Sequence, residues 1–164
     1  MPNERRIDAT DARLLLALTH RPRATALALA EELGISRNTV QSRLSRLESD
    51  GLLASFERRI DPKPLGYPLT AYVTTQVVQR ELDSVSRALA GIPEVVQVQG
   101  ISGQNDLMVH VVARDADDLY RIAGQILAVP GVERTHTALV MRELLDYRIS
   151  PLLEALANGG REPS

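Results

Sequence analysis

The residues of this sequence that could recognise a partner chemically are concentrated between positions 36 and 46. A helix advances by about 100° per residue, which places Val40, Leu44 and Leu47 on one narrow apolar side. The remaining faces carry hydroxyl, amide and guanidinium groups. Asn and Gln side chains can pair with adenine, and Arg side chains with guanine or phosphate. The predicted DNA contacts are Ser36, Arg37, Asn38, Thr39, Gln41, Ser42, Arg43, Ser45 and Arg46.

The residues around the start of this helix fit a helix-turn-helix. Ala30 is small enough to let two helices cross closely, Gly34 can adopt the backbone angles of the turn, and Val40 fills the junction. In this motif the second helix lies in the major groove of DNA. A generic three-helix bundle with a polar outer face is the alternative that the spacing leaves open. Two roles stay open for Arg43: contact with phosphate, or a link to an acid such as Asp11.

Composition and charge limit the other classes of function. The 164 residues include no Cys, which excludes disulfides and Cys-ligated metals and is typical of a cytoplasmic protein. No carboxylate or Cys accompanies His110 or His136 at ligand spacing, so neither a metal nor a cofactor is expected. No apolar run approaches the roughly 18–20 residues that cross a bilayer, so no membrane partner is expected. The net charge of −2 divides into +2 for residues 1–60 and −4 for residues 61–164, so the N-terminal part is the more basic.

Three helices are predicted in the first 60 residues, each with a side chain that can cap its N-terminus. Asp8 can form a capping box with Asp11 at the first helix. Thr25 and Ser36 can cap the second and third. The predicted helices cover residues 11–20, 26–33 and 37–49.

The chain after residue 51 changes its pattern. Weak alternation over residues 52–60 predicts a short strand, and the three prolines of "DPKPLGYPL" predict a hinge at residues 61–69. Beyond the hinge, β-branched segments alternate with segments of helical spacing in the order β-α-β-β-α-β, which is that of the ferredoxin-like split unit. The predicted strands are residues 70–79, 94–103, 106–114 and 132–143, and the predicted helices are residues 82–92 and 115–129.

The predicted fold class is therefore α+β. An N-terminal winged helix-turn-helix domain occupies residues 1–60, and a C-terminal ferredoxin-like βαββαβ domain occupies residues 70–150. The hinge joins them, and a C-terminal tail of residues 151–164 follows. Residues 150–157, which overlap the start of this tail, can form a short helix.

Both faces of the predicted sheet need cover. "LMVHVVA" (residues 107–113) is almost entirely apolar, and "TAYVTTQVV" (residues 70–78) has little charge, whereas a sheet with one wet face alternates apolar and polar residues. The two helices can cover one face, and a second copy of the sheet can cover the other. We therefore expect a homodimer, which is also needed to contact two DNA half-sites one helical turn apart.

Several motifs, in the right order, resemble those of the Lrp/AsnC family of feast/famine regulators. "IDATDARLLLAL" resembles the family's opening D-x-x-D-x-x-I-L, and "RATALALAEELGISRNTVQSRLSRLESDGLL" resembles its helix-turn-helix signature. "DPKPLGYPLTAYV" resembles the family's linker. "PEVVQVQGISGQNDLMVHV" resembles its P-x-V…G-x-x-D stretch, and "VPGVERTHTALVM" its P-G-V…T-x-T strand.

The resemblance covers roughly residues 7–152 and implies a transcriptional regulator that is not an enzyme. Its N-terminal domain would bind double-stranded DNA. Its C-terminal domain, of the RAM or ACT-like type, would dimerise and bind a small effector, usually an amino acid. Dimers in this family commonly associate further, often to octamers, and the effector sits between dimers near the turn that joins the second and third strands.

The predicted effector contacts lie in that turn and on the last strand. Backbone N–H groups around Gly103 could hold a carboxylate, and Asp106 could accept an ammonium group. An ordinary hairpin loop is the open alternative, since Gly, Asn and Asp are common in turns. The family often has acidic or aromatic residues where this chain has Gln104 and Asn105, so its effector preference differs or binding is lost. The predicted contacts are Ser102, Gly103, Gln104, Asn105, Asp106, Thr135 and Thr137.

Two other functions are compatible with parts of this pattern. An architectural DNA-binding protein of the same fold would need no ligand and would differ only at the turn. Some tetrapyrrole decarboxylases resemble the whole fold, and His110 and His136 could hold the carboxylates of a macrocycle. The intact recognition helix with its Arg and Ser side chains argues against the enzyme.

Overall fold

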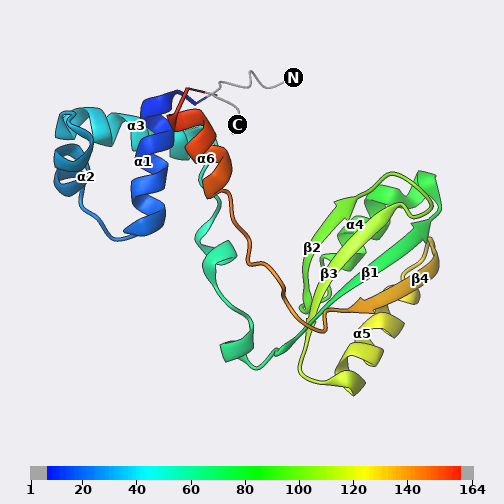
Figure 1. Ribbon diagram of the computed structural model, residues 1–164. Coiled ribbons are helices and arrows are strands. Elements are labelled where there is room, and N and C mark those ends of the chain that lie inside the picture. Colours follow the sequence, from blue (N-terminus) through cyan, green and yellow to red (C-terminus); the bar gives the residue numbers. More distant parts are fainter. Residues whose placement is uncertain (1–6, 160–164) are drawn as a thin grey trace. The chain divides into compact units, whose positions relative to one another are not determined.

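The computed structural model describes residues 7–159, which divide into two compact units (Figure 1). The helical unit comprises the chain up to Ser55 together with the segment from Leu145 onward, and the sheet unit is Phe56–Leu144. Residues 1–6 of the predicted first domain and residues 160–164 of the predicted tail lie outside the described residues. No helix within residues 7–159 is long and apolar enough to cross a membrane.

The helical unit begins with three capped helices, as predicted. They are α1 (Ala9–His20), α2 (Ala26–Leu33) and α3 (Arg37–Ser49). Asp8 and Asp11 form the expected capping box, with the Asp11 N–H donating to Asp8 Oδ1 at 2.8 Å and the Asp8 N–H donating to Asp11 Oδ2 at 3.2 Å. Thr25 and Ser36 cap α2 and α3 through the N–H groups three residues on. The sequence patterns at these three N-termini are confirmed.

The turn between α2 and α3 has the geometry of a helix-turn-helix. Gly34 adopts a φ of 66°, in the left-handed region that favours glycine. The Ile35 N–H then donates to the Ala30 carbonyl at 3.1 Å and closes the end of α2. Val40 is fully buried at the junction, where it joins the core with Leu14 and Leu29. The three positions chosen from the sequence therefore form the turn and the packed junction between α2 and α3.

A fourth helix, α6 (Ser150–Ala157), completes the helical unit and packs on α1. Leu153 is 6% exposed and belongs to the same apolar core as Leu14 and Leu47. Its neighbours Leu152 and Leu156 stay exposed. The predicted tail thus contains the expected short helix, and that helix helps to form the core of the helical unit.

The short strand expected over residues 52–60 is absent, so that expectation is wrong. The structure has instead two 3₁₀ helices, η1 (Phe56–Arg59) and η2 (Lys63–Leu65). A strand needs a neighbour for its backbone N–H and C=O groups, and every residue from 51 to 60 is exposed. The alternation here was weak and had no apolar face to bury, so local turns satisfy the backbone instead.

The sheet unit has the expected ferredoxin-like topology. Its elements are β1 (Leu69–Val77), η3 (Gln79–Glu81), α4 (Leu82–Leu89), β2 (Val95–Gly100), β3 (Leu107–Ala113), α5 (Ala116–Leu127) and β4 (Val132–Leu139). The strands pair antiparallel in the order β2-β3-β1-β4. The last strand ends before residue 143, the predicted limit, because its partner β1 starts at Leu69 and offers only one further bond, from the Val140 N–H to the Thr70 carbonyl at 2.9 Å.

One face of the sheet is covered by α4 and α5 (Figure 1). Alternate residues of β1 and β3, such as Val73, Val109 and Val111, are fully buried against the two helices. On the opposite face, Tyr72 stacks on His110 with ring centroids 4.8 Å apart. Tyr72 is still 36% exposed. This open face is the one for which the sequence predicts a second copy as cover.

Candidate nucleic-acid interface and effector turn

The helix α3 presents the predicted polar face to the outside of the helical unit. Val40 and Leu47 are buried, and Leu44 is half-buried beside them. Of the nine predicted DNA contacts, only Thr39 and Arg43 are half-buried. The other seven are exposed, namely Ser36, Arg37, Asn38, Gln41, Ser42, Ser45 and Arg46. The structure therefore buries one apolar stripe of α3 and leaves most of its polar side chains exposed.

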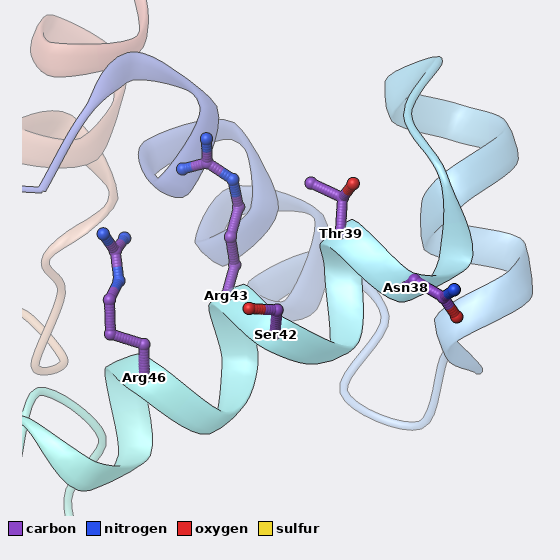
Figure 2. Close-up of a pocket in the computed structure, with 5 residues that line it drawn as sticks. All are labelled: Asn38, Thr39, Ser42, Arg43 and Arg46. Carbon is purple, nitrogen blue, oxygen red and sulfur yellow. The ribbon is translucent and has the colours of Figure 1, made fainter.

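Five side chains of this face line a shallow pocket on α3 (Figure 2). They are Asn38, Thr39, Ser42, Arg43 and Arg46. Arg43 and Arg46 extend from successive turns in the same direction, and the short side chains of Thr39 and Ser42 leave the hollow between the longer ones (Figure 2). Small residues among amides and guanidinium groups allow a close approach of base edges.

The first turn of α3 is capped by Ser36. The Ser36 Oγ accepts the Thr39 N–H at 3.0 Å and lies 2.8 Å from the Thr39 hydroxyl. The first backbone bond of the helix runs from the Val40 N–H to the Ser36 carbonyl. The N–H groups of Arg37 and Asn38 precede that bond and point out of the helix end, where a phosphate is favoured by the helix dipole.

Arg43 and Arg46 bind two carboxylates at the start of α1. Arg43 Nη1 donates to Asp8 Oδ2 and to Asp11 Oδ1, both at 2.7 Å. Arg46 Nη2 donates to Asp11 Oδ2. Asp11 is fully buried, whereas the side chain of Asp8 is 53% exposed. We refer to these four residues as the Asp–Arg cluster. Arg43 therefore takes the second of its two predicted roles, as a link across the bundle.

The cluster favours the ionised forms of Asp8 and Arg43. The hydrogen bond from Arg43 is the main reason that the pKa of Asp8 lies below its ordinary value. The hydrogen bonds to Asp8 and then to Asp11 raise the pKa of Arg43. The sequence did not indicate the contact between Arg46 and Asp11. A signal was present in the spacing. Asp8 and Asp11 are three residues apart, as are Arg43 and Arg46, so the members of each pair lie on the same side of their helix.

The turn between β2 and β3 is braced against the end of β1. Asp106 Oδ2 accepts the Val77 N–H at 2.9 Å, and Asp106 Oδ1 accepts from Gln79 Nε2 at 2.5 Å. The Asp106 N–H donates to the Thr75 carbonyl at 2.9 Å. Gln76 Nε2 donates to the Gln104 carbonyl at 2.6 Å. Both carboxylate oxygens of the predicted ammonium acceptor thus already hold the turn in place.

The remaining turn residues sit at an open position. Ser102, Gly103 and Gln104 are exposed, and Asn105 is half-buried. Gly103 has a φ of 117°, so a side chain there would strain the backbone. The turn can therefore present backbone groups that no β-carbon shields.

The two predicted threonines of β4 point toward the face that α4 and α5 cover. Thr135 pairs with Thr75, and Thr137 with Val73, and directly paired residues point to the same side of a sheet. Thr75 is fully buried and also pairs with Leu107, the residue that follows the turn. The structure therefore brings Thr135 to the same end of the sheet as the turn, while Thr137 lies two residues further along β4.

Comparisons with known proteins match both units. Residues 7–54 match the family described as winged helix-turn-helix DNA-binding, and residues 70–149 match the Lrp/AsnC ligand binding domain. The HTH-type transcriptional regulator AldR of Mycolicibacterium smegmatis is 33% identical over 144 residues, which cover 85% of this chain and 84% of AldR. The chain belongs to the Lrp/AsnC family.

Solved structures agree with this Lrp/AsnC assignment at the level of the fold. The structure of AsnC from E. coli superposes with a TM-score of 0.79 at 23% identity, covering 89% of this chain and 99% of that one. A transcriptional regulator from Neisseria meningitidis, solved as a complex with L-Met, gives a TM-score of 0.75 at 20% identity, covering 86% of this chain and 94% of that one. The resemblance and the fold class inferred from the sequence are confirmed.

Each of the two matched ranges contains one of the two candidate sites. The matched helix-turn-helix range contains α1, α2, α3 and the Asp–Arg cluster, and the matched ligand-binding range contains the sheet and the braced turn. The helix α6 begins at Ser150, just beyond both ranges. Within the described part of this family member, no group of three His, Asp or Glu side chains could hold a metal ion.

Proposed function

We propose that this Lrp/AsnC family member is a sequence-specific DNA-binding transcriptional regulator whose DNA binding or assembly responds to an amino-acid effector. The observation that carries the proposal is the exposed polar face of α3, held by a buried apolar stripe at the helix-turn-helix junction. It is not an enzyme in this proposal, and the relatives' names as transcriptional regulators support that assignment.

The DNA-binding role rests on three groups of donors and acceptors on α3. Asn38 and Gln41 carry amides that match the edge of adenine in the major groove. The N–H groups of Arg37 and Asn38 lie where a phosphate can bind the helix end. Ser42, Ser45 and Arg46 lie further along the helix, and Nε and Nη1 of Arg46 make no hydrogen bond within residues 7–159. Contacts with phosphate position a protein on the duplex, and contacts with base edges give sequence specificity.

A selected binding site tests this role. Duplexes that the wild-type protein retains from a random pool would supply the site, and its affinity would be compared with that for a scrambled duplex. The double variant Asn38→Ala and Gln41→Ala is expected to lose most of this discrimination, since each bidentate pair contributes about 1–3 kcal/mol. The matched control is Gln125→Ala with Asn158→Ala, both exposed and neither of them part of α3. Unchanged discrimination by the first variant would refute the assignment of the reading face.

The effector role rests on the braced turn and Thr135. An amino acid needs a donor set for its carboxylate and an acceptor for its ammonium group. The exposed backbone around Gly103 supplies the first, and Asp106 the second, because each carboxylate oxygen can accept more than the one bond it has now. The relative from Neisseria meningitidis that was solved with L-Met supports an amino acid as the class of ligand.

A thermal-shift screen of the twenty amino acids tests the effector. A ligand that binds only the folded protein stabilises it by about 2.7 kcal/mol at a hundredfold excess over Kd. A shift that is lost in Asp106→Ala supports the proposed site. The second candidate function is a ligand-independent architectural DNA-binding protein, favoured by the internal bonds that already occupy Asp106. No shift with any amino acid, together with intact DNA binding, would favour this second candidate.

The uncovered face of the sheet supports a proposal about assembly. Tyr72, His110 and Met108 lie on that face, and a second copy placed against them would bury apolar and aromatic surface. We propose a homodimer built on this face, which associates to higher oligomers such as an octamer. Sedimentation of the wild type and of Tyr72→Glu tests it, since a charge at the centre of a dimer interface disrupts it. Equal sedimentation of the two proteins would contradict this interface.

A further inference from the structure

We infer that Asp8 limits non-specific DNA affinity by cancelling the charge of Arg43 on the DNA-facing side of the helical unit. The inference rests on the proposed DNA-binding role of α3 and deepens it. Asp8 is the N-cap of α1 and lies outside the recognition helix. The inference gives it a part in how that helix discriminates between sequences.

The first step is the charge of the Asp–Arg cluster. Two carboxylates face two guanidinium groups, so the cluster has no formal net charge. The side chains of Arg43 and Arg46 are only 25% and 43% exposed, and both lie in the pocket on the reading face. Two of the arginines best placed to meet DNA are therefore already paired within the protein.

The second step is what this pairing does to DNA binding. Non-specific affinity comes from cations that displace counterions from phosphates, and each phosphate neutralised adds about 0.9 to the slope of log K against log salt. A guanidinium paired with a carboxylate adds little to that term. Within the described residues, all hydrogen bonds of Arg43 leave from Nη1, so Nε and Nη2 can still donate to a base edge. Arg43 can thus take part in reading sequence while it contributes little to sequence-independent attraction.

The third step separates Asp8 from Asp11. Asp11 is fully buried between the two arginines, so its removal disturbs the fold. Asp8 lies at the rim, where its two oxygens do different work. Oδ1 caps α1 by accepting the Asp11 N–H, and Oδ2 accepts from Arg43. An Asn at this position keeps the capping oxygen and caps a helix as well as Asp does, but its NH₂ group cannot accept from Arg43.

The test is the salt dependence of binding to a mixed-sequence duplex of about 30 base pairs, followed by fluorescence anisotropy from about 50 to about 300 mM NaCl. Asp8→Asn leaves the cluster with one uncompensated positive charge. We expect its slope to steepen by about 0.9 and its affinity near 0.1 M salt to rise about five- to tenfold. Asp50→Asn is the matched control, because it removes the same charge from the same unit at an exposed residue for which no ion pair is found within residues 7–159. Its slope should equal that of the wild type.

A second variant identifies the cation that is released. Adding Arg43→Gln to Asp8→Asn should return the slope to the wild-type value. If Asp8→Asn has the slope of the wild type and of Asp50→Asn, the inference is overturned while DNA binding stands. A weaker affinity at an unchanged slope would show that Asp8 only positions Arg43, and would also overturn it. A wild-type protein that does not bind the duplex at any salt concentration would overturn the proposed function and this inference together.

Discussion

Each of the two candidate sites is braced by one aspartate, the buried Asp11 in the helical unit and the half-buried Asp106 in the sheet unit. The two aspartates have different hydrogen-bond partners. Asp11 in the helical unit is surrounded by charge, since Arg43 and Arg46 both donate to it. Within residues 7–159, Asp106 in the sheet unit accepts from two neutral groups, the Val77 N–H and the Gln79 amide. In the first arrangement the Asp11 carboxylate compensates the charge of the arginines, and the other polar side chains of α3 stay available for DNA. In the second, neutral donors hold the Asp106 carboxylate beside the turn, where a cationic group could still approach.

The largest effect is expected from removing the charged partner of the two arginines. Asp11→Asn should lower the free energy of unfolding by about 3 kcal/mol, because breaking a buried ion pair leaves charge without compensation. Urea unfolding followed by circular dichroism measures it. Asp50→Asn, at an exposed residue, should stay within about 0.5 kcal/mol of the wild type. Equal values for the two variants would mean that the Asp–Arg cluster does not stabilise the helical unit.

The next effect tests whether the helical unit depends on its C-terminal helix. Leu153→Ala should cost about 2–3 kcal/mol, since it creates a cavity in the core shared with Leu14. The adjacent Leu152 is 65% exposed, so Leu152→Ala should cost far less. Differential scanning calorimetry of both variants measures the difference. Similar losses at the two positions would contradict the packing of α6 on α1.

A smaller effect is expected at the sheet unit. Asp106→Asn keeps one acceptor oxygen and loses the other, so it should cost about 1.5 kcal/mol, the lower end of the range for one hydrogen bond to a charged group. Thermal unfolding of this variant measures the loss of stability, and Asp146→Asn, a change at an exposed residue, is the control. A cost as large as that of Asp11→Asn would remove the distinction between a charged and a neutral set of donors.

The two units should also respond to acid at different pH values. Burial lowers the pKa of His110 below its ordinary value of 6.5. The unfolded chain therefore binds this proton more readily, and the stability of the sheet unit should begin to fall as the pH drops through about 6.5. His110→Gln should flatten the melting temperature between about pH 7 and pH 5. An unchanged dependence in this variant would exclude His110 as its source.

The smallest effect belongs to Asp8. Its pKa is lowered in the folded state, chiefly by Arg43, so its stabilising contribution is present above its unfolded value of 3.8 and is lost as the pH falls through the folded value. Asp8→Asn should therefore lose less stability than the wild type when the pH is lowered from about 5 to about 2. Acid titration followed by circular dichroism compares the two. A steeper loss in the variant would reverse the sign of this linkage.

Local features of the sequence predicted most of the fold. The capping residues Asp8, Thr25 and Ser36 act within three residues of themselves, so their roles could be inferred without the rest of the chain. The strands β1 and β3 were likewise predicted from their own β-branched and apolar residues, and their burial alternates in the structure because helices cover one face. The strand expected over residues 52–60 failed because a strand depends on a neighbour that the local pattern does not contain.

The site was less predictable where its bonds join distant parts of the chain. Arg43 and Asp11 are 32 residues apart, and the sequence left two roles open for Arg43. Asp106 was expected to face a ligand, and only the structure shows that the end of β1 already engages it. In α6, three leucines lie close together, and their spacing does not tell which of them packs on α1. The assignments of DNA and effector contacts remain predictions for the experiments above.

The packing of Leu153 against α1 means that the sheet unit is an insertion within the helical unit. During synthesis on the ribosome, α1, α2 and α3 emerge first, but one wall of their core is made only after the whole sheet has been translated. Until α6 has been synthesised, the part of the apolar core that Leu153 covers stays exposed on the first three helices. A nascent chain halted before residue 150 would carry a recognition helix on an incomplete bundle, so the order of translation itself delays the appearance of a stable DNA-reading surface.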